Sequence, residues 1–183
     1  MRFNRYFPEV YPICINLKGR KNKKKRVKKH LKSYGINTNF YTATLHKHPK
    51  RGCLESHLHV IQNAVDKKHN YLLILEDDAL FIRDVKNLPK PPKDWDMLYL
   101  GGTVKHIFQE YIDGKKKNEP WIRMTCWTTH AYIVNLKNKE LVADILKAKN
   151  EPLNVEIDTY YIHHIQEKYK AYMIKPMRCI QQE

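Results

Sequence analysis

The chain has 183 residues, with 34 Lys and Arg against 19 Asp and Glu, so its formal net charge is +15. This length suits a single domain spanning residues 1–183, and the positive field favours an anionic partner such as nucleic acid, anionic lipid or a phosphate-bearing small molecule. No apolar run approaches the roughly 18 residues of a membrane span, and the N-terminal residues lack the apolar core of a signal peptide. The four cysteines form no Cys-x-x-Cys pair, which argues against a zinc knuckle or a dense disulfide scaffold. We therefore expect a soluble protein with reduced thiols in a cytoplasmic or host-cytoplasm-like compartment.

A strongly basic segment follows the first predicted strand, which covers Tyr11–Leu17. Ten of the fifteen residues at positions 18–32 are Lys or Arg, yet Val27 and Leu31 recur with helical spacing, so we expect an amphipathic helix with a cationic outer face. That face is either a solvated lysine surface or a region that attracts phosphate or a polyanion. Arg20 lies in the strand-to-helix loop, where open α/β folds often bind ligands.

A second predicted strand, Asn39–Ala43, leads to a clearer helix over residues 53–68. Apolar residues three or four positions apart form one stripe along this helix. Ser56 and His57 fall near its predicted N-terminus, where exposed backbone N–H groups can bind an anion. The other interpretation is that His57 is simply packed in the core. The alternation of strands and helices favours an α/β fold with helices on both faces of a central sheet.

The most informative stretch is an apolar run, Tyr71–Leu75, that ends in three consecutive carboxylates, Glu76, Asp77 and Asp78. The run has the length of a buried strand, which would carry the acids to its C-terminal edge. If the extended geometry continues, Glu76 and Asp78 point to one side and Asp77 to the other. Like charges this close repel one another unless a cation or a proton joins them, and carboxylate oxygens suit magnesium or manganese. The stretch is therefore either a metal site or an acidic corner that faces water.

The middle of the chain indicates a mixed, mostly parallel sheet. Asp94–Leu100 is predicted as a buried strand, and the glycine pair that begins at Gly101 serves either close approach of a ligand or a tight turn. Lys105–Ile112 and Trp121–Cys126 predict an antiparallel hairpin with a long tip, and Thr128–Val134 predicts a further strand. No GxGxxG or P-loop motif occurs, which counts against nucleotide dehydrogenases and P-loop NTPases.

A second acidic position of interest lies near the C-terminus, where Asp158 begins the last predicted helix. Asp158 either caps that helix, stabilising it by about 1 kcal/mol, or acts as a general base that takes a proton from an attacking hydroxyl. We expect His164 to be packed and His163 to face solvent or a metal. The tail is expected to bring Arg178 and Gln181 back to the sheet.

Several of these motifs occur together, in the same order, in one known family. They are Ile15–Leu17 with Arg20, Gly52 and Cys53 with Ser56 and His57, Leu75–Asp78, Trp95–Gly101, and Thr129–Tyr132. In this set the chain resembles the family 25 glycosyltransferases, which include bacterial lipooligosaccharide galactosyltransferases and the collagen hydroxylysine galactosyltransferases. The resemblance covers residues 11–182. It implies a GT-A-like nucleotide-diphospho-sugar transferase fold, a manganese-dependent reaction and inversion at the anomeric carbon of the sugar.

The resemblance also implies roles for individual residues. Asp78 is the best direct ligand of a manganese or magnesium ion, with Glu76 beside it acting on the metal through water or on the ribose. Asp158 matches the late acidic position of the family and becomes the candidate base. The third metal ligand stays open among His163, His164 and Gln181. The residues implied in donor binding are Asn16, Arg20, Ser56, His57, Asp77 and Gly101.

We therefore expect an inverting, metal-dependent hexosyltransferase that moves galactose or glucose from a UDP-sugar to an acceptor hydroxyl. The acceptor is either hydroxylysine of a collagen-like protein or a glycan. One alternative is a nucleic-acid-binding module, which accounts for the net charge but leaves the acidic cluster unexplained. Another is an inactive, glycan-binding relative. The basic segment at residues 18–32 exceeds what the family usually carries, and acceptor docking, catalysis and solubility are all open roles for it.

Overall fold

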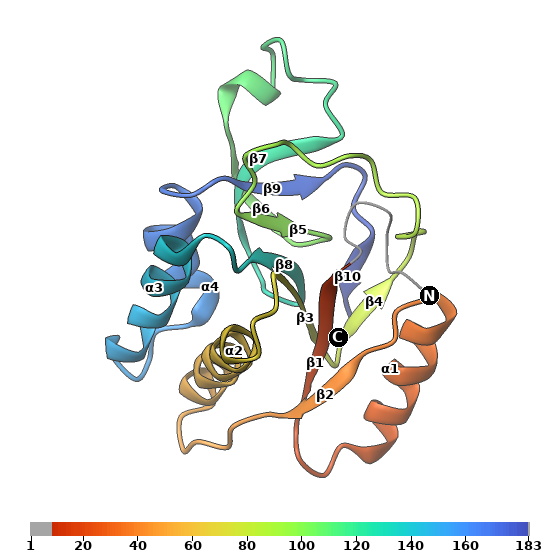
Figure 1. Cartoon of the computed structure of the whole chain (residues 1–183), viewed down its shortest axis with the longest axis vertical. Coiled ribbons are helices and arrows are strands. Elements are labelled where there is room, and N and C mark those ends of the chain that lie inside the picture. The colour runs from red at the N-terminus through yellow and green to blue at the C-terminus, as the bar shows by residue number, and fades with distance from the viewer. Residues whose placement is uncertain (1–8, 183) are drawn as a thin grey trace.

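The computed structural model describes residues 9–182, which form an eight-stranded central sheet and a separate two-stranded sheet (Figure 1). One half of the central sheet is parallel: β1 (Val10–Asn16) lies between β2 (Asn39–Thr42) and β3 (Tyr71–Glu76). Two helices make the crossovers, α1 (Lys21–Ser33) from β1 to β2 and α2 (Pro49–Asp66) from β2 to β3. The carboxyl ends of the three strands therefore meet at one edge of the sheet.

The other half of the sheet is mixed. In spatial order it continues from β3 through β8 (Ala131–Asn135), β5 (Met97–Tyr99), β9 (Ala171–Ile174), β7 (Trp121–Trp127) and β6 (Thr103–Ile107). Only β7 and β8 run against the other strands of this sheet. The predicted mixed, mostly parallel sheet is confirmed, and β6 with β7 forms the predicted antiparallel hairpin.

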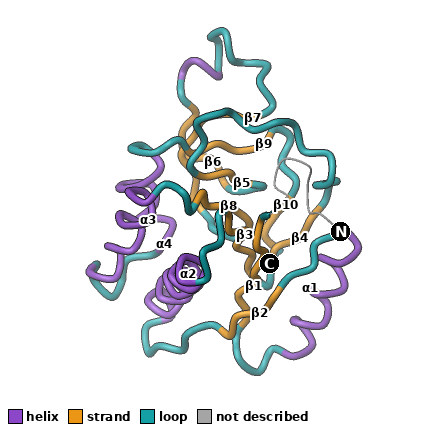
Figure 2. The backbone as a smooth tube through the Cα atoms, viewed as in Figure 1, coloured by secondary structure: helices purple, strands orange, loops and turns teal. Residues whose placement is uncertain are grey.

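Helices flank the sheet, with α1 on one side and α2 on the other (Figures 1 and 2). Beside α2 lie α3 (Lys139–Leu146) and α4 (Ile157–Tyr160), and α4 continues as a π-helical turn at Tyr161–Gln166. Short 3₁₀ turns occur at Gln109–Tyr111 and Lys147–Asn150. Within residues 9–182, no helix combines the length and apolar character needed to cross a bilayer. The N-terminal residues on which the signal-peptide prediction rests lie outside the described part.

The core explains why an unbroken apolar run forms β3. Its four central residues, 72–75, are fully buried, because β3 lies between β1 and β8 in the sheet and α2 packs against it. On α1, only Val27 and Leu31 among thirteen mostly charged residues are buried. Burial of each side chain of this size stabilises the folded state by about 1.5–3 kcal/mol. Val27 and Leu31 therefore determine which face of α1 packs against the rest of the protein.

The C-terminal tail forms the separate sheet, in which β10 (Cys179–Gln181) is antiparallel to β4 (Ala79–Phe81). The backbone N–H of Gln182 donates to the carbonyl of Asp78 at 2.8 Å, so the tail closes over the turn that follows β3. The expected return of the tail is confirmed, although it pairs with β4 instead of extending the central sheet.

Several predicted boundaries were wrong. Helix α2 begins at Pro49, because proline suits the first helical position, so Ser56 lies two turns inside the helix and the predicted anion site at a helix end does not exist. The strand expected at Thr128–Val134 starts only at Ala131, because Thr128 has a positive φ of 71°. His164, expected to be packed, is exposed, and its ring lies tilted against that of Tyr160 at a centroid distance of 4.7 Å.

Gly101 is where the tail approaches β5 most closely. A Cβ there would lie 1.8 Å from the carbonyl oxygen of Cys179. We expect Gly101→Ala to lower the free energy of unfolding by about 3 kcal/mol, because backbone cannot yield as a flexible side chain can. Urea denaturation measures this loss. Gly19→Ala is the control: its φ is +88° and nothing lies within 4 Å of the added Cβ, so only about 1 kcal/mol should be lost. Equal losses would contradict the steric argument.

Candidate active site

The three carboxylates lie in the turn between β3 and β4. The strand ends at Glu76, and Asp77 and Asp78 are turn residues, so the expected alternation of side chains does not continue through them. Each acid instead contacts a different part of the fold. This separation is how three neighbouring carboxylates are accommodated at one strand end.

Glu76 is held from α2 and from the loop before β8. It accepts a hydrogen bond from Oγ1 of Thr129 at 2.9 Å and lies 3.4 Å from Nε2 of His57. Nδ1 of His57 is 2.8 Å from the hydroxyl of Tyr132, which is 3.1 Å from that of Tyr161. Burial favours the neutral imidazole, but the interactions of His57 with Cys53 and Glu76 outweigh it and raise the pKa of His57 to about 10. Burial likewise opposes ionisation of Glu76, and His57 more than offsets it, so the pKa of Glu76 is lowered. The pair is therefore an ion pair at neutral pH.

Asp77 joins β1 and α1 to the end of β3. Its carboxylate accepts from Nδ2 of Asn16 at 2.6 Å, lies 2.9 Å from Nζ of Lys23 and is 3.8 Å from the guanidinium of Arg20. Asn16 is buried and acts through this contact. Asp77 is thus neutralised within the protein.

Asp78 is the least satisfied of the three acids. Its Oδ2 accepts from Nε2 of Gln181 at 3.1 Å, while its Oδ1 is buried without a hydrogen-bond partner among residues 9–182. Burial, and next the charge of Glu76, raise the pKa of Asp78. A divalent cation would satisfy this oxygen and offset the repulsion between the two acids.

The donor set fits a metal that the substrate helps to hold. Within the described residues no group of three or more His, Cys, Asp or Glu side chains is arranged to hold an ion. Magnesium and similar hard cations are often bound by one or two carboxylates, with substrate phosphates and water completing the shell. Asp78, with Glu76 beside it, suits that arrangement.

Two cavities meet at the acidic turn. The central cavity, of about 390 Å³, lies between the ends of β1 and β2 and the start of α2; Arg20, Ser56, His57 and all three acids line it. The Asp158 cavity, of about 340 Å³, shares Glu76 and adds Asp158 and Gln181. The structure therefore brings most of the predicted site residues together around one turn.

Asp158 is not the helix cap. The N-cap of α4 is Glu156, and Asp158 lies inside the first turn. Its two oxygens accept from the backbone N–H groups of Thr128, at 3.2 Å, and Thr159, at 2.7 Å. The positive φ of Thr128 is unusual for a β-branched residue, and the next residue, Thr129, is the one that binds Glu76. Asp158 therefore also helps to fix the loop that positions Glu76.

Three predicted site residues are not part of this group. Gly101 makes room for the backbone of Cys179, so its close approach is to the chain's own tail. His163 and His164 lie exposed on the π-helical turn and line neither cavity.

Sequence reasoning also missed residues that matter. No role was assigned to Lys23, Thr129, Tyr132 or Tyr161, although Thr129–Tyr132 was among the motifs of the family resemblance. The Thr129–Tyr132 motif was therefore the one signal in the sequence that pointed to Thr129 and Tyr132. Nothing local in the sequence distinguishes Lys23 from its neighbouring lysines.

Replacing His57 by Gln tests the buried ion pair. The pKa of His57 is raised from 6.5 to about 10 in the folded protein, so its stabilisation is full below the unfolded value and is lost as the pH rises through the folded one. Glu76, with a lowered pKa, contributes above its ordinary value of 4.5. Urea unfolding should therefore show the largest deficit of His57→Gln near about pH 6 and a smaller one near about pH 9.5. A deficit that is constant over this range would contradict the pair, and His106→Gln, at an exposed site, is the control.

Comparisons with known proteins agree with this geometry. A family model described as glycosyltransferase family 25 (LPS biosynthesis protein) matches residues 47–162, more than half of the chain. No curated protein sequence matches the chain.

The chain is also similar to solved structures, of which two are described here. One is a glycosyltransferase involved in the glycosylation of the major capsid of PBCV-1, with a TM-score of 0.59 and 13% identity over 91% of this chain and 82% of that one. The other is a mannose-1-phosphate geranyltransferase from Thermus thermophilus, with a TM-score of 0.51 and 9% identity over 91% of this chain and 73% of that one. The fold is the expected GT-A-like fold of nucleotide-sugar transferases. With the family model matched over the acidic turn, the Thr129 loop and Asp158, the chain belongs to glycosyltransferase family 25.

Proposed function

We propose that this glycosyltransferase transfers a hexose, galactose or glucose, from a UDP-sugar to an acceptor hydroxyl, with inversion and with the help of a manganese or magnesium ion. The observation that carries the proposal is the buried, unpartnered Oδ1 of Asp78 on the wall of a cavity that also holds Arg20. A diphosphate in the central cavity would meet a cation at Asp78 and the guanidinium of Arg20.

The nucleotide fits the central cavity best. The cavity is bordered by the carboxyl ends of β1 and β2, through Leu17 and Thr44, which is where open α/β sheets bind nucleotides. A divalent ion at Asp78 would stabilise the negative charge that develops on the diphosphate as it leaves. Arg20, half exposed at the start of α1, would contact the same phosphates from the protein side.

The acceptor fits the Asp158 cavity. Its hydroxyl would attack the anomeric carbon as the bond to the diphosphate breaks, and Asp158 would take the hydroxyl proton. Glu76, held by His57 and Thr129, borders both cavities and so lies between donor and acceptor. The acceptor hydroxyl belongs either to a glycan or to hydroxylysine of a collagen-like protein.

The metal role is tested by Asp78→Asn. With UDP-galactose or UDP-glucose and manganese, we expect release of UDP by the wild-type protein, and a fall of about 100-fold or more in Asp78→Asn, because the neutral amide cannot hold the cation. Asp84→Asn, at an exposed acid outside the cavities, should keep wild-type activity. Full wild-type activity in excess chelator would refute the metal role.

The base role is tested by Asp158→Asn. The one amide oxygen can still accept from the backbone of Thr128, which should keep the loop in place, although the hydrogen bond from Thr159 is lost and the group can no longer take a proton. We expect unchanged affinity for UDP with manganese by calorimetry and a loss of about 100-fold or more in sugar transfer to acceptor. Unchanged turnover would remove Asp158 from the mechanism.

A further inference from the structure

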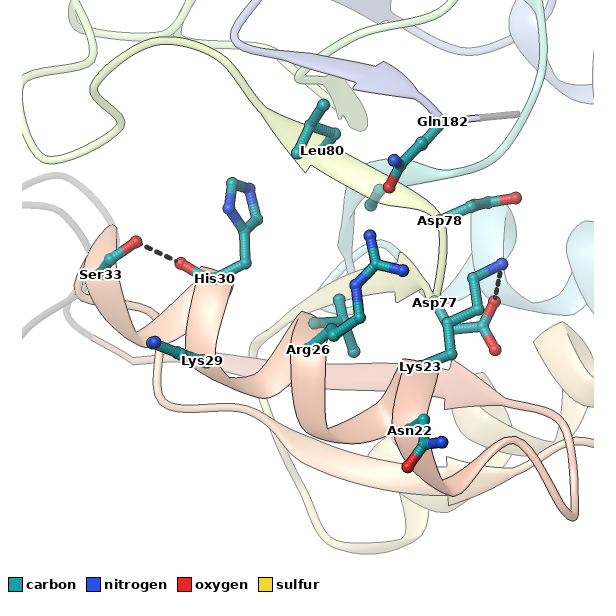
Figure 3. Close-up of a pocket in the computed structure, with 12 residues that line it drawn as sticks. Asn22, Lys23, Arg26, Lys29, His30, Ser33, Asp77, Asp78, Leu80 and Gln182 are labelled. Carbon is teal, nitrogen blue, oxygen red and sulfur yellow. Dashed lines mark hydrogen bonds and ion pairs between the residues drawn. The ribbon is translucent and has the colours of Figure 1, made fainter.

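A third cavity, of about 630 Å³, lies between α1 and β4, on the other side of the acidic turn from the central cavity (Figure 3). It shares Asp77 and Asp78 with the central cavity, but the roles described above leave its α1 wall unused. We call it the α1 cavity. It is larger than either of the other two, so a substituent of substrate size can enter it.

The α1 wall is cationic. Lys23, Arg26 and Lys29 are three residues apart and line the cavity from one side of the helix. Figure 3 shows Arg26 projecting from α1 into the space below Leu80 and Gln182. Arg26 and Lys29 are exposed, and neither has a hydrogen bond or ion pair with another residue of the described chain. Two cations here are thus free to bind a ligand.

The remaining walls do not cancel this charge. Asp77 is already paired with Lys23 and Asn16, and Asp78 is the carboxylate that the proposed divalent cation would neutralise. His30 accepts from the backbone N–H of Phe81 through Nε2, and burial lowers its pKa, so it is neutral. The opposite wall, from β4, is formed by Ala79 and Leu80. The cavity therefore combines free cations with an apolar surface.

Helix stability does not explain these cations. The first turn of α1 contains no acidic residue, and the N-cap, Arg20, makes no side-chain cap hydrogen bond. Arg26 and Lys29 also lie outside the first and last turns of α1, where the macrodipole acts, so helix electrostatics do not favour cations at these positions. A solvated surface accounts for lysines that point to water, such as Lys25 and Lys28, but not for a guanidinium directed into a cavity.

We propose that the α1 cavity binds a phosphate group carried by the acceptor, so that the acceptor is a phosphorylated sugar or glycan. Arginine binds phosphate through two parallel hydrogen bonds, and Lys29 adds a second charge one turn away. Leu80 would contact the apolar face of the sugar that carries the phosphate. This assignment rests on the proposed function, because it takes the donor to occupy the central cavity.

The tail connects the α1 cavity to the reacting groups. Gln182 lines the α1 cavity, and its neighbour Gln181 lines the Asp158 cavity. An acceptor can therefore run along β10, with its hydroxyl at Asp158 and its phosphate at Arg26. The same geometry disfavours a hydroxylysine acceptor, whose own ammonium would meet the free cations.

The test is calorimetric titration of glucose 6-phosphate, with glucose as the uncharged comparison, into the whole chain at low ionic strength. We expect binding of glucose 6-phosphate only. The double variant Arg26→Gln with Lys29→Gln should weaken it by about 10-fold or more, because charge-assisted hydrogen bonds are lost. The matched control is Lys25→Gln with Lys28→Gln, which removes the same charge from exposed positions of α1 that do not line the cavity; we expect at most about a 2-fold change there.

A second titration separates this site from the donor site. With UDP and manganese already saturating, glucose 6-phosphate should still bind, because it occupies a different cavity. Equal losses in the two double variants, equal binding of glucose, or displacement of glucose 6-phosphate by UDP would each overturn the proposal. Thermal melting followed by circular dichroism checks that both variants fold. The proposed function is tested by a different measurement: it fails if the wild-type protein shows no manganese-dependent release of UDP. The first titration measures only binding of glucose 6-phosphate, so its result can be interpreted in either case.

Discussion

The repulsion among three consecutive carboxylates at the end of a buried strand is the constraint on which the architecture depends. β3 delivers Glu76, Asp77 and Asp78 to one strand end, and each contacts a different region: Glu76 contacts His57 and Thr129, Asp77 contacts Asn16 and Lys23, and Asp78 contacts Gln181. These contacts join α2 and the loop before β8, then β1 and α1, then the C-terminal tail, to the same strand end. Keeping the three acids apart and closing the fold around them are therefore one process.

The division of contacts also divides the chemistry. Two of the acids have ionic partners inside the protein, and Asp78 alone has a buried oxygen without a partner in the described chain. Burial and a neighbouring carboxylate raise the pKa of Asp78, and the divalent cation that we propose would relieve both unfavourable interactions. Asp78 borders the central and α1 cavities, and Glu76, two residues before it, borders the Asp158 cavity, so the acidic segment links all three.

Local sequence patterns predicted the strands and helices well where a single period dominates. The run before Glu76 predicted β3, and the basic amphipathic pattern predicted α1. The patterns failed where backbone geometry determines the boundary of an element. Helix α2 begins earlier than predicted, at Pro49, and β8 begins later than predicted because Thr128 has a positive φ. The site contacts were beyond such reasoning, because His57 meets Tyr132 across 75 positions and Gln181 meets Asp78 across 103. Only the ordered motifs of the family indicated that these segments converge.

The net charge of +15 illustrates how composition and position carry different information. Composition predicts only attraction to anions, and it suits nucleic acid, lipid and phosphate equally well. The fold then sorts the basic segment: Arg20 faces the central cavity, Lys23 neutralises Asp77, Arg26 and Lys29 line the α1 cavity, and Lys25 and Lys28 face solvent. A polyanion that tracks the whole helix would use all of these cations. A small phosphate held beside a sugar-transfer site needs only Arg26 and Lys29, the two that line the α1 cavity and have no side-chain partner in the described chain.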